Sequence, residues 1–323
     1  MSYRIFVTGS GIAEQARQLL IREQCVVETG DPKDTPADLV RKLKDFNPDG
    51  LIVRQGKITA EVQNAAPQLK VICKHGVGMD NIDCVNAAQR GIPVMFTPFA
   101  NFESAAEHTL ALLLSLARRI SQEDKRIRSG VFDKKKYDGL ELFEKTLGII
   151  GFGKIGRRFA ELVAPFKINV LVYHPSNTEE SLPAHIAKVK HAADLLSRAD
   201  IISLHCPLTP ETKGMINKQT IASMKKDVYI INTARGGLVN ENDLVQALQE
   251  GRIAGAALDV FEEEPPPASH PLFTLENVIF TTHVAGMSDN SVKNMGIESA
   301  KNVLAVLKGE KLNREALWNP ETK

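Results

Sequence analysis

The sequence has few cysteines and lacks any apolar run long enough to cross a membrane. Its four cysteines show no Cys-x-x-Cys spacing, which argues against a disulfide framework or a zinc site and favours a reducing compartment: Cys25, Cys73, Cys84 and Cys206. The most apolar run, Leu110–Ala117, is too short to span a bilayer. The first residues, MSYRIFVTGSG, lack the regions of a signal peptide. We therefore expect a cytoplasmic protein without a bound metal.

An excess of one charge sign is also missing. Lys and Arg number 40 against 39 Asp and Glu, which leaves a net charge of +1. Such a balance gives no strong field to attract nucleic acid or anionic lipid, so we expect neither as a partner. The 323 residues suffice for about two domains of roughly 100–200 residues each.

The first hundred residues alternate short β-type runs with polar helical segments such as 36–44 and 59–65. This rhythm predicts a parallel sheet with helices on both faces. None of its turns carries a Gly-x-Gly-x-x-Gly motif. The expected strands are Tyr3–Thr8, Cys25–Glu28, Gly50–Val53, Lys70–Lys74 and Pro93–Phe96.

After a long helical stretch, about Asn101–Ser129, the rhythm restarts and ends in a helix near Ser288–Lys308. Helical segments such as 154–164 and 240–250 separate most of the new strands. This is the inventory of a complete dinucleotide-binding domain. The six expected strands are Thr146–Gly151, Asn169–Tyr173, Asp200–His205, Val228–Asn232, Ala254–Val260 and Asn277–His283.

The run GIIGFGKIG passes from an apolar strand into a glycine-rich turn and then a helix. Gly151, Gly153 and Gly156 fit Gly-x-Gly-x-x-Gly. The first glycine permits the tight turn, the second lets the backbone approach a pyrophosphate, and the third allows close helix packing. Lys154 and Ile155 would open the helix whose N-terminus receives the phosphates. The motif therefore predicts a bound dinucleotide.

The choice between NAD(H) and NADP(H) depends on the end of the next strand. An acidic residue that holds the ribose hydroxyls is expected about 20 residues after the glycines, and His174 stands there instead. His174 and Ser176 would offer hydrogen-bond donors to a 2′-phosphate, which favours NADP(H). Glu179 or Glu180 folding back to restore NAD(H) binding stays an open alternative.

Candidate catalytic side chains fall at or beside predicted strand ends in the second half. Arg235 follows one strand, and a guanidinium there can bind a carboxylate through two parallel hydrogen bonds. Asp259 ends the next strand and precedes three glutamates, 262–264, while His283 ends the last. Parallel sheets bring such ends together, and an acid–base site requires this combination of groups.

The sequence resembles the D-isomer-specific 2-hydroxyacid dehydrogenases, and the phosphoglycerate dehydrogenase branch most of all. The resemblance covers nearly the whole chain. It rests on KHGVGMDNID, AEHTLALLLSLARRI, GIIGFGKIG, LHCPLTPET, INTARGGLV, ALDVFEEEP and HVAG, in that order.

The resemblance implies a role for each catalytic candidate. Arg235 would bind the carboxylate and carbonyl of a 2-oxo acid, and His283 would be the general acid that protonates the carbonyl oxygen. Glu264, the glutamate just before the proline, would pair with the histidine and favour its charged form. Asp259 would face the nicotinamide carboxamide.

The same resemblance implies further binding residues and the domain plan. A nucleotide-binding domain, 100–287, would be inserted into a flavodoxin-like substrate domain, 1–99 with 288–323, so that both domains are doubly wound parallel sheets of the Rossmann kind. Besides the glycines and His174, the cofactor would meet His205, Pro207, Thr212, Thr233, Ala234, Asp259, His283 and Gly286. The substrate would meet Arg54, Gly76, Val77, Gly78, Asn101, Arg235 and His283.

The identity of the 2-oxo acid stays open. Arg54 could meet a second anionic group, or form a salt bridge with a local acid. Phe99 and Phe102 add bulk relative to the family, and no serine-binding regulatory domain follows, so glyoxylate, hydroxypyruvate and phosphoglycerate-type substrates remain alternatives. A homodimer is expected, with the apolar face of 106–117 as core or contact. Other interpretations are a non-catalytic dinucleotide-sensing corepressor and a formate or phosphite dehydrogenase; the formate enzymes carry glutamine where Glu264 stands.

Overall fold

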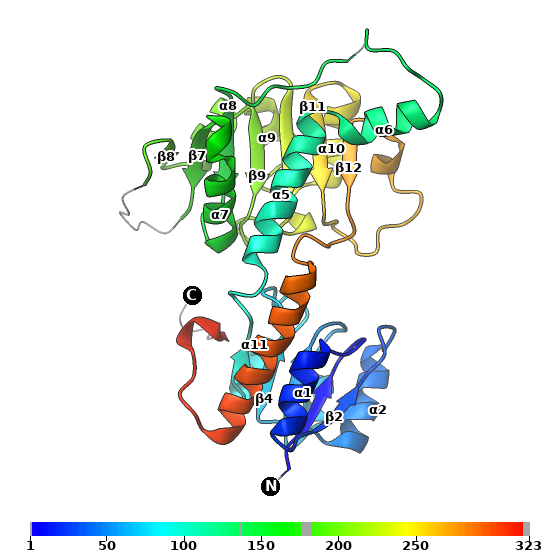
Figure 1. Cartoon of the computed structure of the whole chain (residues 1–323), viewed down its shortest axis with the longest axis vertical. Helices are drawn as coiled ribbons and strands as arrows, with labels where there is room; N and C mark the ends of the chain where they lie inside the picture. The colour runs from blue at the N-terminus through cyan, green and yellow to red at the C-terminus, as the bar shows by residue number, and fades with distance from the viewer. Residues whose placement is uncertain (1, 136, 176–181, 319–323) are drawn as a thin grey trace. The chain divides into compact units, whose positions relative to one another are not determined.

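The computed structural model describes residues 2–135, 137–175 and 182–318. The chain divides into two compact units, residues 1–101 with 287–323 and residues 102–286 (Figure 1). Each unit is built around its own parallel sheet. Among the described residues, no helix is both long and apolar enough to cross a membrane.

The first unit is a sheet whose strands run in the order β13-β5-β4-β3-β1-β2. Apart from the short β13, which pairs antiparallel with β5, the strands are parallel and follow the flavodoxin-like order 2-1-3-4-5. Its elements are β1 (Arg4–Val7), α1 (Glu14–Arg22), β2 (Val26–Thr29), α2 (Pro36–Phe46), β3 (Gly50–Val53), α3 (Ala60–Asn64), β4 (Val71–Lys74), α4 (Cys84–Gln89), β5 (Val94–Met95), α11 (Asp289–Lys308), η4 (Arg314–Ala316) and β13 (Leu317–Trp318).

The C-terminal helix α11 belongs to this first unit. Ser288 caps its start by accepting a hydrogen bond from the Ser291 amide, and Gly309 ends it in the left-handed conformation. Its buried face, which includes Val303, packs with α1 and the sheet (Figure 1). The last part of the chain therefore completes the core that the first hundred residues begin.

The second unit is a parallel sheet with the strand order β12-β11-β10-β9-β6-β7-β8. This is the doubly wound order 3-2-1-4-5-6 of dinucleotide-binding domains with one further strand, β12, at its edge. The elements are α5 (Phe102–Ala117), α6 (Ile120–Arg128), β6 (Thr146–Ile150), α7 (Lys154–Val163), η1 (Ala164–Phe166), β7 (Asn169–Tyr173), β8 (Ile186–Lys188), α8 (Ala192–Arg198), β9 (Ile201–Leu204), α9 (Lys218–Ser223), β10 (Val228–Asn232), η2 (Gly236–Leu238), α10 (Glu241–Gln249), β11 (Ile253–Leu258), η3 (Pro271–Thr274) and β12 (Val278–Phe280). The predicted fold class is confirmed.

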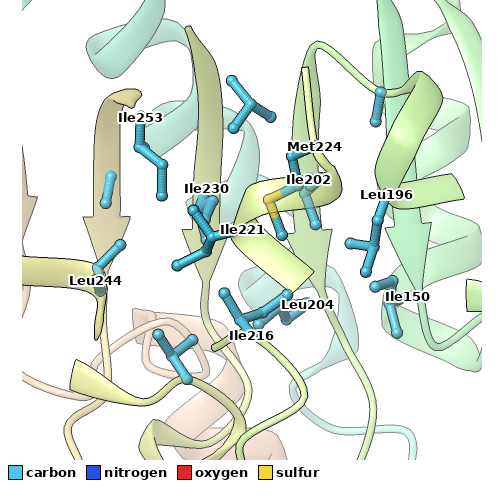
Figure 2. Close-up of a cluster of buried hydrophobic side chains, with 14 of the residues drawn as sticks. Ile150, Leu196, Ile202, Leu204, Ile216, Ile221, Met224, Ile230, Leu244 and Ile253 are labelled. Atoms are coloured by element: carbon cyan, nitrogen blue, oxygen red, sulfur yellow. The ribbon is translucent and has the colours of Figure 1, made fainter. Parts of the chain in front are cut away.

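Apolar side chains fill both faces of the second sheet. On one face Ile202, Ile230 and Leu244 belong to a cluster beneath α8, α9 and α10 (Figure 2). On the other face α5 and α7 cover Ile149 and Ile231. Burial on both faces makes this sheet a rigid support for the loops at its ends.

Two expectations about local structure were wrong. The single helix expected over 101–129 is two helices, α5 and α6, because Arg119 adopts a left-handed backbone with φ of 51°. The buried stripe of α5 ends at Ala117, and α6 has no buried residue. Beyond Ala117, packing against the core therefore no longer stabilises a continuation of the straight helix. The short edge strands β8 and β13 were also missed, since they are too brief to show alternation.

Candidate active site

The parallel register of the second unit brings the carboxyl ends of five strands to one edge. The aligned last residues are Ile150, Leu204, Asn232, Leu258 and Phe280. The loops that follow carry the expected site residues Gly151, Arg235, Asp259 and His283. This is the edge at which α/β sheets bind their ligands.

His283 and Glu264 form the expected pair. Nδ1 of His283 lies 2.7 Å from Oε2 of Glu264, and the other carboxylate oxygen accepts a hydrogen bond from the Phe261 amide at 3.1 Å. The two side chains are 50% and 37% exposed. Because Nδ1 is engaged by the carboxylate, Nε2 is the nitrogen that can exchange a proton with a ligand. The backbone of His283 is left-handed, with φ of 55°, a strained state that is frequent at functional positions.

Asp259 supports the loop that carries the histidine. Its carboxylate is fully buried and accepts hydrogen bonds from the Thr281 hydroxyl at 2.5 Å, the Val284 amide at 2.9 Å and the Ala285 amide at 2.9 Å. The His283 amide donates to the Asp259 carbonyl at 2.7 Å. The buried carboxylate therefore holds the loop on both sides of His283. Its contact with a nicotinamide stays a prediction.

Arg235 lies on the turn that follows β10. The Asn232 side chain accepts a hydrogen bond from the Ala234 amide at 3.0 Å and donates one to the Arg235 carbonyl at 2.8 Å. The next residue, Gly236, touches the neighbouring segment so closely that a Cβ there would lie 1.9 Å from the Phe261 carbonyl carbon. The turn that carries the arginine is thus packed on the segment that leads to Glu264.

Each glycine of the Gly-x-Gly-x-x-Gly motif has its own geometric reason. Gly151 has φ of +95°, and a Cβ there would lie 2.5 Å from the Cys206 amide nitrogen. A Cβ at Gly156 would lie 2.3 Å from the Gly151 carbonyl oxygen, so only glycine lets α7 pack this close. A Cβ at Gly153 would meet nothing within 4 Å. Lys154 and Ile155 form the start of α7, and Gly153 leaves open space in front of it. The turn therefore fits a pyrophosphate.

His174 directly follows β7, whose last residue, Tyr173, accepts a hydrogen bond from the Gly151 amide at 2.9 Å. The strand end expected to face the adenosine ribose is therefore tied to the glycine turn. Ser176 lies outside the described residues, as do Glu179 and Glu180.

The remaining cofactor candidates line the same edge in different ways. The His205 imidazole bonds the Ser203 hydroxyl at 2.9 Å and packs on Phe159, and burial lowers its pKa to about 4. It is the backbone of His205, not its ring, that lies against the glycine turn. Thr212 donates to the Pro207 carbonyl at 2.7 Å and so fixes the loop after β9.

Thr233 and Ala234 lie on the turn between β10 and Arg235. The Thr233 hydroxyl is 3.0 Å from that of Thr109, which anchors the turn to α5. Gly286 follows Ala285, whose carbonyl accepts a hydrogen bond from Ser104 at 3.0 Å. The described cofactor candidates therefore lie in loops after the aligned strand ends, directly after β7, whose Tyr173 pairs with Ile150, or at the N-terminus of α7.

The first unit carries its own group of expected residues. Arg54 donates to the Ser10 hydroxyl at 2.9 Å and to the Gly11 carbonyl, and burial lowers its pKa. Among the described residues no carboxylate forms an ion pair with it, so the salt-bridge alternative is not what holds this guanidinium.

The loop after β4 holds the glycines of the KHGVGMDNID motif. Gly76 has φ of 125°, and its amide donates to the Thr97 hydroxyl at 2.9 Å. Val77 is 41% exposed, and Gly78 follows it. Asn101 ends the first unit, and its buried Oδ1 has no hydrogen-bond partner among the described residues. Arg54, this loop and Asn101 provide the polar groups expected of a substrate-binding surface.

Three histidines of structural interest were missed from the sequence. His75 precedes Gly76; burial, and then Arg54, lower its pKa to about 4, so it is neutral at pH 7. His108 lies 3.0 Å from the Thr281 hydroxyl that bonds Asp259. His270 lies 3.0 Å from Glu241. Only His75, next to a motif glycine, has a local signal; the other two depend on tertiary contacts.

The class that this fold and site define is the dinucleotide-dependent dehydrogenases. Residues 110–285 match the family model described as D-isomer specific 2-hydroxyacid dehydrogenase, NAD binding domain. The chain is 41% identical over 313 residues to a glyoxylate reductase of Thermofilum pendens, which covers 92% of this chain and 91% of that one. The chain therefore belongs to the D-isomer-specific 2-hydroxyacid dehydrogenase family, as the sequence resemblance predicted.

Other relatives agree. A D-3-phosphoglycerate dehydrogenase of Methanocaldococcus jannaschii is 44% identical over 280 residues, 85% of this chain and 52% of the relative. This chain spans about half the length of the first curated relatives it matches. The crystal structure of the TT0316 protein from Thermus thermophilus superposes with a TM-score of 0.87 at 36% identity, over 95% of this chain and 98% of that one.

Proposed function

We propose that this protein reduces a small 2-oxo acid to the D-2-hydroxy acid with a nicotinamide cofactor, and catalyses the reverse reaction. The observation that carries the proposal is the His283–Glu264 pair at 2.7 Å, on the same sheet edge as the glycine turn and Arg235. The glyoxylate reductase and phosphoglycerate dehydrogenase relatives support this chemistry.

Each residue has a defined task in that reaction. The bound cofactor supplies the hydride. Arg235 binds the substrate carboxylate through two parallel hydrogen bonds and so orients the carbonyl. His283 donates the proton on Nε2 to the carbonyl oxygen, and in the reverse direction the same nitrogen removes it. Glu264 fixes the ring through its hydrogen bond with Nδ1.

The glycine turn and the start of α7 would hold the pyrophosphate, since Gly153 leaves room for it. The cofactor is NAD(P), and we propose NADP(H) as the preferred form. His174, at the strand end tied to the glycine turn, supports this preference because it offers a hydrogen-bond donor where a carboxylate would repel a 2′-phosphate.

The first unit carries candidate substrate-binding groups of its own. We propose that backbone groups around Gly76, Val77 and Gly78 hold the substrate carboxylate and that Arg54, held by neutral partners, meets a polar or anionic substituent. Asn101 offers a buried acceptor that lacks a partner among the described residues. Substrates of the glyoxylate, hydroxypyruvate or phosphoglycerate type fit these groups.

We propose a homodimer whose interface lies on a surface other than the apolar face of 106–117. Ala106, Leu113 and Leu116 on α5 are buried in the core of the second unit. Several exposed apolar side chains lie instead on α6, labelled in Figure 1, and on the segment after it, where Phe132 is 93% exposed. One groove there is lined by several apolar side chains: Ile120, Ile127, Val131, Phe132 and Tyr137. A partner that covers this surface would remove it from water.

The four cysteines are free thiols, three of them buried. We therefore retain a reducing, cytoplasmic setting as a proposal. The alternative of a non-catalytic dinucleotide sensor finds no support among the relatives, which are dehydrogenases and a reductase by name.

The test is a screen of 2-oxo acids with NADH and with NADPH, followed by nicotinamide absorbance, on wild type and the His283→Ala variant. We expect at least one acid to be turned over by wild type, and kcat to fall about 10²- to 10⁴-fold in the variant because proton transfer is lost. Cofactor affinity should stay unchanged. Equal turnover by both proteins would refute the assignment of the acid.

A further inference from the structure

The segment that carries Glu264 is anchored to a buried carboxylate outside the proposed site. Oε1 of Glu241, at the start of α10, accepts a hydrogen bond from the Glu262 amide at 2.8 Å. Oε2 of Glu241 lies 3.0 Å from Nε2 of His270. The Glu241 and His270 side chains are only 11% and 12% exposed. One carboxylate therefore holds both ends of the segment 262–270.

The hydrogen bonds also place the proton on His270. Its Nδ1 accepts a hydrogen bond from the Leu272 amide at 3.3 Å, so Nδ1 carries no hydrogen in this arrangement. Nε2 must then carry the proton and donate it to Glu241, since a carboxylate oxygen only accepts. The Glu241 carboxylate is stabilised by the Glu262 amide, by His270 and by the N-terminus of α10. Both side chains are satisfied in a single tautomer.

Packing restrains the same segment from its other sides. The Phe261 ring stacks on that of Phe280, the last residue of β12, with centroids 5.8 Å apart, and meets the His270 ring edge-on at 5.9 Å. Gly236 lies directly on the Phe261 backbone, with no room for a side chain. Phe261 in turn donates its amide to Glu264. A shift of this segment would therefore move the carboxylate that holds His283.

We propose that Glu241 and His270 form a buried clamp that positions Glu264 against His283, so that both are positioning residues for the acid–base step. Neither side chain contacts His283 itself in the described structure; they act through the backbone of 261–264. The inference rests on the proposed function for its kinetic consequence. The geometric part, that the clamp sets the His283–Glu264 hydrogen bond, is testable without turnover.

Two substitutions at His270 separate its hydrogen bond to Glu241, which forms the clamp, from its local hydrogen bond with the Leu272 amide, which caps η3. His270→Gln places an amide nitrogen near the position of Nε2 and can still donate to Glu241. His270→Asn instead places a carbonyl oxygen near the position of Nδ1; it can still accept from Leu272 but does not reach Glu241. If the clamp positions Glu264, Gln should rescue function and Asn should not. If only the hydrogen bond from the Leu272 amide matters, Asn should rescue function and Gln should not.

We expect His270→Asn to lower kcat about 10- to 100-fold, because a displacement near 1 Å can cost about 10²-fold. The KM for the 2-oxo acid and the dissociation constant of the reduced cofactor should stay within about twofold of wild type. His270→Gln should retain most of the wild-type kcat. Glu241→Gln should behave like His270→Asn, because its amide can no longer accept the proton of Nε2 while the neighbouring oxygen still accepts from Glu262.

The readout without substrate is the Nδ1–H proton of His283, followed by NMR on protein labelled with ¹⁵N-histidine and identified by its loss in His283→Gln. A short hydrogen bond to Glu264 places this proton downfield, and His270→Asn and Glu241→Gln should move or broaden it, whereas His270→Gln should not. An unchanged resonance in both disruptive variants overturns the clamp, whatever their kcat. If wild type turns over no 2-oxo acid, the proposed function fails while this comparison still decides the clamp. Should a histidine variant not fold, Glu241→Gln alone decides it.

Discussion

The backbone contact between Gly236 and Phe261 predicts an unusually large effect for one added methyl group. In Gly236→Ala the Cβ would lie 1.9 Å from the Phe261 carbonyl carbon, 2.0 Å from its oxygen and 2.4 Å from the Glu262 amide nitrogen. Ordinary contact begins near 3.4 Å, so one of the two backbones must retreat by about 1.5 Å. Either the turn of Arg235 or the segment of Glu264 is then displaced.

A displacement of this size in the reacting geometry is worth about 10²-fold in rate, which is about 2.7 kcal/mol of barrier. We therefore expect kcat/KM for the 2-oxo acid to fall at least about 100-fold in Gly236→Ala. Cofactor affinity should fall much less than kcat/KM, because the glycine turn after β6 is untouched, although Thr233 and Ala234 lie on the turn of Arg235. The assay is steady-state kinetics on the best acid of the screen, with fluorescence titration of the reduced cofactor.

Gly237→Ala provides the matched control. The three atoms nearest to its Cβ would all belong to the Leu208 side chain, the first at 3.1 Å, and this leucine is 37% exposed and can move. This neighbour should lose less than about threefold in kcat/KM, since a flexible side chain absorbs the contact. Wild-type kinetics in a folded Gly236→Ala variant, or equal losses in the two variants, would show that the turn and the segment are not coupled.

Three further predictions concern the cofactor, the assembly and pH. His174→Asp should shift the preference from NADPH towards NADH, measured as the ratio of kcat/KM values; an unmoved ratio removes His174 from the cofactor argument. Sedimentation should show a dimer for wild type and a smaller species for Phe132→Ser, because its exposed ring loses the burial that a partner would provide; a monomeric wild type refutes the assembly. The pKa of His75 is lowered from 6.5 to about 4 by burial, so the unfolded chain binds the proton first and stability falls as pH drops from 6.5 towards 4, by up to about 3 kcal/mol. Denaturant unfolding should show a flatter pH dependence for His75→Gln, and an identical dependence in both proteins contradicts this account.

Long, strongly patterned elements were predictable from the sequence, whereas short edge elements were not. Gly50–Val53 and Val228–Asn232 carry consecutive apolar residues because both faces of their sheets are covered, and their bounds match the structure. β8 is a three-residue edge strand, IAK, with one buried residue, so it has no pattern to detect. The break at Arg119 was hidden because the helical period continues in the sequence while burial stops.

The candidate site was predictable where its chemistry lies in local motifs. The glycine turn is readable because three glycines must follow a strand and open a helix, and the structure gives each its geometric reason. The pairing of His283 with Glu264 came from resemblance, since nothing local links residues that far apart. Glu241 and His270 carried no signal at all, because their contact exists only once the segment between β11 and β12 has folded back onto α10.

Asp259 shows why the position of His283 depends on buried groups beneath its loop. A left-handed backbone at a residue other than glycine costs about 1–2 kcal/mol, and His283 adopts it with φ of 55°. A fully buried carboxylate is costly as well unless hydrogen bonds satisfy it. The same hydrogen bonds offset both costs. The loop must turn sharply at His283 for the Val284 and Ala285 amides to reach Asp259, and these amides satisfy the buried carboxylate. Asp259 therefore fixes the backbone of the loop at His283, and the carboxylate of Glu264 then orients the imidazole through Nδ1.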